Sequence, residues 1–149
     1  MEEIEGVIAS CREALTFCPP GHPDRRKCLD TLAYGVHVRY QTTGTKKDLE
    51  EVITCNREAL KLCPPGHPNR YMSLNNLANM VFSSYQHFGV VEDRDEAIRS
   101  YTEALTLCPP GWYFYIIIKL SPYVDFCVFR NVPTIFQPQQ PWKCSSLSL

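Results

Sequence analysis

Two pairs of cysteine and histidine side chains are the residues best suited to metal or nucleophile chemistry in this sequence. Cys18 and His22, like Cys63 and His67, are four residues apart, so each pair offers a thiolate and an imidazole. Two such pairs would supply the Cys2His2 ligand set of a zinc site. Equivalent atoms of stacked helical units lie roughly 10 Å apart, however, whereas zinc ligands lie about 2–2.3 Å from the ion. We therefore expect no metal site, and interpret Cys18, Cys63 and Cys108 as small buried apolar residues at helix ends.

Signatures of catalysis and of nucleic-acid binding are missing from the sequence. It contains no caspase-type Q-A-C-x-G string, no phosphate-binding G-x-x-x-x-G-K, no H-E-x-x-H and no G-x-S-x-G. Asp24 and Asp30 flank the basic triplet of residues 25–27, which favours a solvated helix start over a nucleic-acid site. The net charge of -1 provides no overall field for phosphate backbones. We expect a protein that is not an enzyme, has no cofactor and does not bind nucleic acid.

An internal repeat determines the elements that must position these residues. The string CPPGHP begins at Cys18 and Cys63, and CPPG begins at Cys108, so the period is 45 residues. Of the 66 residue pairs that are 45 apart and start at residues 1–66, 32 are identical. Only one identity occurs among the pairs whose second member lies in residues 112–149. The chain is therefore a repeat body, residues 1–111, followed by an unrelated tail, residues 112–149.

One predicted helix of each unit precedes the CPPG string. Its apolar residues follow the i, i+3, i+4 spacing of one helix face, which predicts a helix over residues 48–62. Two spacings typical of capping pairs, Asp48 with Glu51 and Asp93 with Glu96, indicate where these helices start. The Pro-Pro-Gly sequence ends the helix, because proline has no N–H to donate and glycine tolerates a left-handed turn.

The other predicted helix of each unit follows the string, and its apolar residues also share one face. They are Leu29, Leu32, Ala33, Val36 and Tyr40 in one copy, and Leu74, Leu77, Ala78, Val81, Tyr85 and Phe88 in the next. We expect Gly44 and Gly89 to end these helices. Because two antiparallel helices cannot bury their apolar faces alone, stacked neighbours must cover them. The prediction for the body is an all-α solenoid segment, with an irregular apolar tail after it.

The repeat resembles the tetratricopeptide repeat. Leu77-Ala78 on one helix, then Ala97, Tyr101, Ala104 and Pro109 on the next, are similar to the small and large residues of that family. Ala78 and Ala97 are 19 residues apart, about two helical turns more than in the standard unit, and this resembles the variant of kinesin light chains. The strings HPNRYMSLNNLANM and DEAIRSYTEALTL are close to that variant's signature. Long fungal proteins with REAL, CPPGHP and LNNLA in tandem look more similar still, and some of them carry a CHAT domain after the array.

In the register of this family, the body is an orphan second helix at residues 1–17, followed by helix pairs at residues 23–62 and 68–107. Because such arrays generally have three or more units, we expect a piece of a longer array. The resemblance implies a non-catalytic interaction module that presents a groove to a peptide or partner helix. Two alternatives stay open: an oligomerising segment whose open ends stack on other copies, and the accessory array of a larger CHAT-type signalling protein.

The first helix of each pair lines the concave groove in tetratricopeptide arrays, so the resemblance places the candidate binding residues there. A helical projection at 100° per residue puts one set of side chains beside the apolar stripe. These candidates are Lys27, Asp30, Tyr34, His37 and Val38 in one unit, and Met72, Asn75, Asn79, Phe82 and Ser83 in the next. Asn76 joins them as the neighbour of Asn75 in a pair of asparagines.

Asparagine amides both donate and accept hydrogen bonds, so a row of them can hold an extended peptide by its backbone. The row is broken, because Asp30-Thr31 stands where the next unit has Asn75-Asn76. An equally simple alternative is that Asn75 and Asn76 bond to a neighbouring helix and stabilise the superhelix.

The tail differs from the body in composition, since all seven glycines of the chain lie in the body. Its segment WYFYIIIKLSPYVDFCVF is apolar, but Lys119, Pro122 and Asp125 interrupt it, so we expect no membrane span. Pro122 would fall in mid-helix if the array continued. The tail is then either an aromatic flap over the last helix or sequence translated from an unspliced or shifted frame, and the abrupt loss of identity favours the second. The acidic N-terminus lacks the pattern of a signal peptide, so we expect a cytoplasmic protein with reduced thiols.

Overall fold

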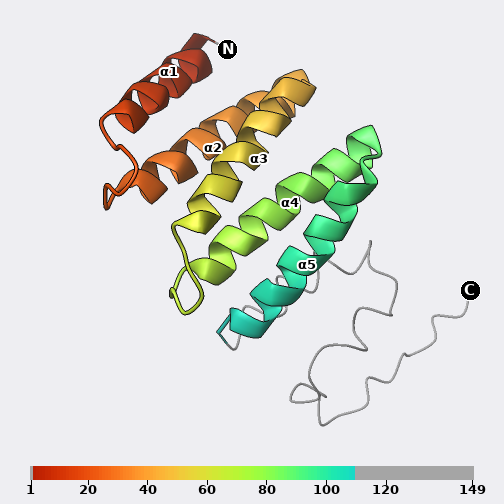
Figure 1. The fold of residues 1–149 in the computed structure, drawn as a ribbon. Coiled ribbons are helices and arrows are strands. Elements are labelled where there is room, and N and C mark those ends of the chain that lie inside the picture. The colour runs from red at the N-terminus through yellow and green to blue at the C-terminus, as the bar shows by residue number, and fades with distance from the viewer. Residues whose placement is uncertain (1, 110–149) are drawn as a thin grey trace, which may run out of the picture.

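The computed structural model describes residues 2–109, which form five helices joined by short loops. In chain order these are α1 (Glu2–Thr16), α2 (Arg25–Thr43), α3 (Lys46–Lys61), α4 (Arg70–Phe88) and α5 (Val91–Leu107). Each helix packs against the next one in the chain, and they lie side by side in a row from α1 to α5 (Figure 1). The described residues therefore form the all-α, solenoid-like stack that the repeat predicts. The predicted tail lies outside the described residues.

Glycine ends α2 and α4, as the sequence predicts. Gly44 and Gly89 have φ angles of 64° and 70°, and their N–H groups donate to the carbonyl oxygens of Tyr40 and Tyr85. Glycine adopts this left-handed conformation without the steric cost that a Cβ would bring. Since α3 and α5 begin only two residues after these glycines, each connection reverses the chain and makes an antiparallel helix pair.

The predicted starts of the helices after these glycines are wrong by two residues. α3 begins at Lys46 and α5 begins at Val91, so Asp48 and Asp93 are the third residues of their helices and do not cap them. The physical reason is that the carboxylates have other partners: Arg39 of α2 donates to Asp48, and Arg57 of α3 lies 4.0 Å from Asp93. Helix α3 also ends at Lys61, one residue before the predicted end.

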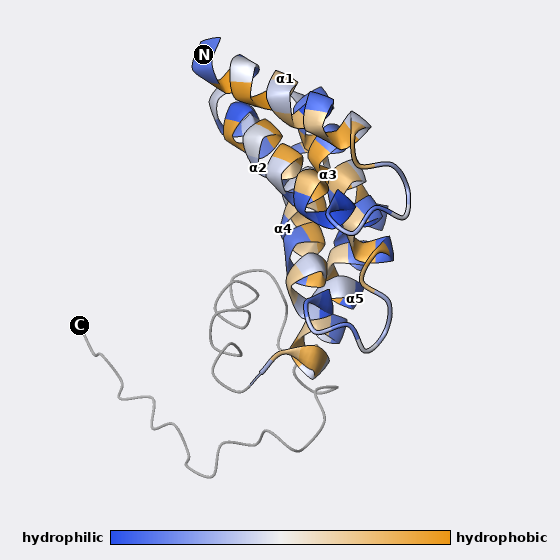
Figure 2. Cartoon of the chain, turned by 90° about the vertical axis from the view of Figure 1, so that its left-hand side faces the viewer, coloured by the Kyte–Doolittle hydropathy of each residue, from blue (hydrophilic) through white to orange (hydrophobic). Residues whose placement is uncertain are grey.

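Two hydrophobic clusters hold the stack together. The first joins α1, α2 and α3 through Ile8, Leu29, Leu32, Ala33, Val36, Val52, Cys55 and Ala59. The second extends from α2 to α5 through Tyr40, Leu49, Ile53, Leu74, Leu77, Ala78, Val81, Ala97, Tyr101, Ala104, Leu105 and Cys108. Each cluster uses more than one helix pair, so stacked neighbours do cover each other's apolar faces. Figure 2 shows both hydrophobic and hydrophilic residues along each helix, as this packing requires.

The cysteines of the repeated string are buried, as predicted. Cys18 is 7% exposed, Cys63 is 0% exposed and Cys108 is 5% exposed. The histidines of the string have a structural contact of their own, because Nδ1 of His22 accepts the N–H of Asp24, and the second unit repeats this contact 45 residues later. These histidines therefore hold the loop between the helices.

Two kinds of interhelical ion pair recur with the period of the repeat. They are Arg12–Glu51 and Arg57–Glu96, and Arg25–Glu58 and Arg70–Glu103. The guanidinium of Arg25 also donates to the carbonyl oxygen of Cys18 at 2.6 Å, and that of Arg70 donates to the carbonyl oxygen of Cys63 at 2.7 Å. The first arginine after each string thus links the loop before its own helix to a glutamate on the next helix of the chain.

The basic triplet of residues 25–27 pairs with carboxylates, and Lys27, whose side chain is 74% exposed, is solvated as predicted. The Arg25 side chain is only 13% exposed, in its ion pair with Glu58. Arg26 pairs with Asp30 at 2.6 Å, and Lys27 pairs with Asp24 at 3.2 Å. All three positive charges therefore face carboxylates of this chain.

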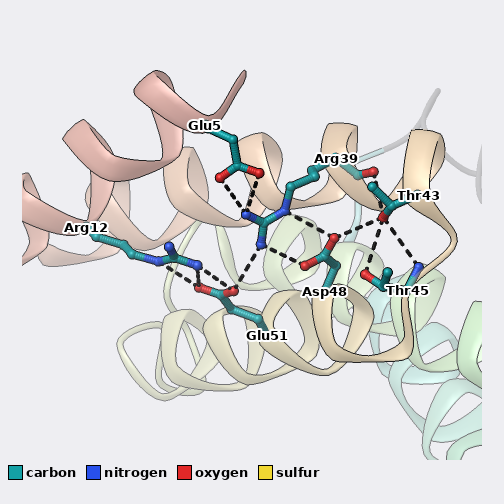
Figure 3. Close-up of polar contacts among 7 residues, drawn as sticks. All are labelled: Glu5, Arg12, Arg39, Thr43, Thr45, Asp48 and Glu51. Atoms are coloured by element: carbon teal, nitrogen blue, oxygen red, sulfur yellow. Dashed lines mark hydrogen bonds and ion pairs between the residues drawn. The ribbon is translucent and has the colours of Figure 1, made fainter. Parts of the chain in front are cut away.

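A larger charge network joins α1, α2 and α3 (Figure 3). Arg39 donates to both carboxylate oxygens of Asp48, at 3.1 and 2.7 Å, and to Glu5 at 2.9 Å. Glu51 lies 3.7 Å from Arg39 and is bridged on its other side to Arg12. The second unit lacks the central cation of this network, because serine stands 45 residues after Arg39.

No helix among residues 2–109 is long and apolar enough to cross a membrane.

Candidate binding groove

A cavity of about 150 Å³ lies between α2 and α4, with two residues of α3 in its wall. Its lining is Asp30, Ala33, Tyr34 and His37 of α2, Val52 and Asn56 of α3, and Asn76, Asn79 and Met80 of α4. Five of the predicted site residues are in this lining. Those on α2 and those on α4 are at least 39 residues apart in the sequence, and the stacking of the helix pairs brings them together.

The cavity has an apolar floor and an aromatic rim. Ala33 and Val52 are 5% and 1% exposed, so they form its inner wall within the first hydrophobic cluster. Tyr34 is 71% exposed, which places its ring at the mouth. The volume is below the roughly 300–1,000 Å³ of small-molecule pockets but is about what one benzene ring occupies. A cavity of this size fits one side chain of a larger partner.

Three asparagines contribute amide groups to the lining of the cavity. Asn56 is 5% exposed and lies on α3, whereas Asn76 is exposed on α4. The Oδ1 atom of Asn79 accepts a hydrogen bond from the Tyr101 hydroxyl of α5 at 2.8 Å. Asn79 therefore has a structural contact within its own helix pair, while its side chain also borders the cavity. Amide groups at a partly apolar surface can pair with the N–H and C=O groups of a bound peptide.

Among the described residues of the lining, Asp30 is the only carboxylate, and none is a lysine or arginine. Burial raises the pKa of the Asp30 carboxyl, and the nearby charge of Arg26 opposes this rise. The ion pair with Arg26 holds the carboxylate at the N-terminal end of α2. The cavity consequently combines neutral amides with a single acidic group at one side.

The other predicted site residues lie outside the cavity. Lys27 is exposed beside Asp24, and Met72 is 45% exposed near the start of α4. Phe82 packs against the second hydrophobic cluster, with its ring 6.1 Å from that of Tyr85. Asn75, Ser83 and Val38 are half-buried and are not in the lining.

Asn75 bears on the alternative that these asparagines hold the stack together. Its Oδ1 atom is buried and accepts no hydrogen bond within residues 2–109. That oxygen thus makes no bond to a neighbouring helix of the described part of the chain. The Asn76 side chain is exposed at the cavity and makes no hydrogen bond between helices within residues 2–109.

Sequence reasoning missed Asn56, because it considered only the first helix of each pair. A signal was present: Asn56 follows Val52 by four residues and Ile53 by three, so it is a polar residue in the apolar stripe of its helix. A buried polar residue at such a position needs a partner or faces a cavity. Here it faces the cavity.

Among residues 2–109, no group of three or more histidine, cysteine, aspartate or glutamate side chains is placed to hold a metal ion. Comparison of the chain with models of known protein families, with curated proteins and with solved structures finds no match in any of the three.

Proposed function

We propose that residues 1–111 are a segment of a tetratricopeptide-type array of the kinesin-light-chain-like kind, and that the cavity between α2 and α4 is part of a groove for a peptide or partner helix. The observation that supports this proposal is the lining itself. Two successive first helices contribute polar side chains to one cavity over an apolar floor. The partner is a protein, and the role is a non-catalytic one in an adaptor or signalling assembly.

The mode of binding follows from the size and chemistry of the cavity. One side chain of the ligand, no larger than an aromatic ring, enters between Tyr34 and Met80. The amides of Asn56 and Asn76 bond to the ligand backbone on either side of it. Backbone bonds of this kind are independent of ligand sequence, so specificity comes from the inserted side chain.

Selection from a displayed library of random peptides against the full chain tests this proposal, with affinities then measured by fluorescence anisotropy. Tyr34→Ala and Asn76→Ala change exposed side chains, so both variants are expected to fold. Each should weaken binding about tenfold, which is roughly 1.4 kcal/mol. Lys47→Ala is the control, because Lys47 is also exposed but lies on α3 outside the cavity. Failure to enrich any peptide, or equal affinities for all three variants and the parent, would contradict the proposal.

One observation favours a second function, stacking on other copies. Val7 of α1 is 54% exposed, whereas Val52, 45 residues later, is 1% exposed. The side chain that is buried on α3 is therefore exposed to solvent at the equivalent position of α1. Light scattering at increasing concentration decides between the two: a monomeric mass throughout excludes stacking, whereas growth that Val7→Glu abolishes supports it.

A further inference from the structure

Two cysteine thiols meet where α1 connects to α2. The Sγ atoms of Cys18 and Cys28 are 3.1 Å apart. Cys18 lies two residues after the end of α1 and is buried, while Cys28 is the fourth residue of α2 and is partly exposed. Both are free cysteines in the structure.

The intervening loop is fixed by contacts that do not involve sulfur. The N–H of His22 donates to the carbonyl oxygen of Pro19 at 2.9 Å, and Arg25 donates to the carbonyl oxygen of Cys18 at 2.6 Å. These bonds hold both ends of the loop, so the fold itself brings the two sulfurs together. A disulfide bond is about 2.05 Å long, so closure requires an approach of only about 1 Å.

The second unit has the same arrangement without the second sulfur. Cys63 and Ser73 occupy the equivalent positions, and Ser73 Oγ lies 3.5 Å from Cys63 Sγ. Arg70 and His67 fix that loop by equivalent bonds, to the carbonyl oxygens of Cys63 and Pro64. The fold therefore accepts a hydroxyl at this position. The thiol of Cys28 is not needed for packing, but it can form a disulfide bond.

We propose that Cys18 and Cys28 are a modification site, at which a small-molecule disulfide such as oxidised glutathione forms a reversible intramolecular disulfide. The more accessible Cys28 attacks first as the thiolate, which forms a mixed disulfide and releases one glutathione thiolate. The Cys18 thiolate then attacks the Cys28 sulfur and releases the second glutathione. Two protein thiols are oxidised by two electrons, the oxidant is reduced to two molecules of glutathione, and the two thiol protons end on those products.

The disulfide would stabilise the attachment of α1. Ile8 is the only residue of α1 that is buried, and Arg12 adds an ion pair to Glu51 of α3. A bond between Cys18 and Cys28 closes a ring across the junction of α1 and α2 and reduces the freedom of the unfolded chain. For a ring of this size, the melting temperature should rise by about 10 °C.

Mass spectrometry of the full chain tests the proposal. The protein is equilibrated with oxidised or with reduced glutathione, free thiols are alkylated, and the chain is digested with trypsin. Cys18 and Cys28 fall in separate tryptic peptides, residues 13–25 and 28–39, so their disulfide is seen as a cross-linked peptide. We expect this cross-link to be at least tenfold more abundant than any other pairing of the eight cysteines, and to disappear in reduced glutathione.

Two variants complete the experiment. Cys28→Ser reproduces what the second unit already has, so it should fold, show no cross-link and lose the oxidant-dependent rise in melting temperature. Ser73→Cys should gain a second cross-link, to Cys63. The proposal is overturned if Cys18 pairs with another cysteine, if Cys28 stops at the mixed disulfide with glutathione, or if both thiols stay alkylatable in the oxidant.

Discussion

Replacement of Asp48 by alanine is expected to destabilise the protein, because it breaks the most buried ion pair of the charge network that joins α1, α2 and α3. Asp48 and Arg39 are 7% and 14% exposed as side chains, and two hydrogen bonds join them. Thr43 donates a third bond to the same carboxylate, at 3.1 Å. Asp48→Ala leaves the Arg39 guanidinium without its best-buried partner and removes one of the two acceptors of the Thr43 hydroxyl, which keeps the carbonyl oxygen of Arg39.

The magnitude follows from the partners that remain. Breaking a buried ion pair costs roughly 3–5 kcal/mol when the other charge is left unpaired. Arg39 keeps Glu5, which is 52% exposed, and a longer contact with Glu51. These contacts reduce the loss, so we expect the free energy of unfolding to fall by about 2–3 kcal/mol.

The second unit supplies a matched control. Asp93 stands 45 residues after Asp48 and is likewise the third residue of its helix, so both carboxylates interact equally with the helix dipole. Its contact with Arg57 is 4.0 Å long, and the Arg57 side chain is 46% exposed. Asp93→Ala should therefore cost less than about 1 kcal/mol.

Urea unfolding followed by circular dichroism at neutral pH measures both variants. The midpoint of Asp48→Ala should lie well below that of Asp93→Ala, with the same slope against urea. If the free energies of unfolding of the two variants fall by the same amount within about 0.5 kcal/mol, the buried pair of Asp48 and Arg39 contributes no more than the exposed contact of Asp93. The predicted difference would then be wrong.

The same pair predicts a pH dependence. Burial raises the pKa of Asp48, but hydrogen bonds from Arg39, Thr45 and Thr43 outweigh it, so the pKa lies below its ordinary value. A depressed pKa in the folded state stabilises the protein above the unfolded pKa of about 3.9, and this contribution is lost as the pH falls through the folded pKa. The stability difference between the parent and Asp48→Ala should thus be constant from about pH 5 to 8 and shrink below about pH 4.

Three further predictions concern backbone, thiol and fragment. Gly89→Ala places a Cβ at a φ of 70° and should lower the free energy of unfolding in urea by about 1 kcal/mol. Gly6→Ala, in open space inside α1, should raise it by roughly 0.5–1 kcal/mol. If both variants changed the free energy of unfolding in the same direction, the result would be inconsistent with the left-handed cap at Gly89. Burial, then the charges of Glu51 and Glu58, raise the pKa of the Cys55 thiol to about 11, so its alkylation rate should keep rising up to about pH 11, and a plateau near pH 9 would contradict this. Residues 1–111 alone should be helical and melt cooperatively by circular dichroism, because both hydrophobic clusters lie within them; a non-cooperative melt would count against a self-contained body.

Local patterns in the sequence were sufficient to predict which segments are helices. The stripe from Leu74 to Val81 and the glycine at position 89 predict α4 and its end, because periodicity and left-handed glycine are properties of the segment itself. The 45-residue identity then predicts that the two copies share one structure. The recurring ion pairs show that they do, since Arg12 and Arg57 make the same contact one period apart.

Contacts between helices could not be predicted in the same way. Asp48 has the spacing of a cap, and only the position of Arg39 on the preceding helix shows that the carboxylate is used elsewhere. Asn56 joins the cavity because the stacking turns α3 toward the space between α2 and α4. Phe82 shares the predicted face with Asn79 but packs against the second hydrophobic cluster. A helical projection gives the direction of a side chain but not the residues of other helices that it contacts.

Mapping of a selected peptide on the folded body by NMR tests whether the cavity between α2 and α4 is the binding site. We predict that the shifted amide signals cluster at Asp30, Tyr34, Asn56 and Asn76, on three helices that only the stacked fold brings together. Shifts confined to the open end around Val7 of α1 would show that the groove is not the binding site, and the proposed function would then be wrong.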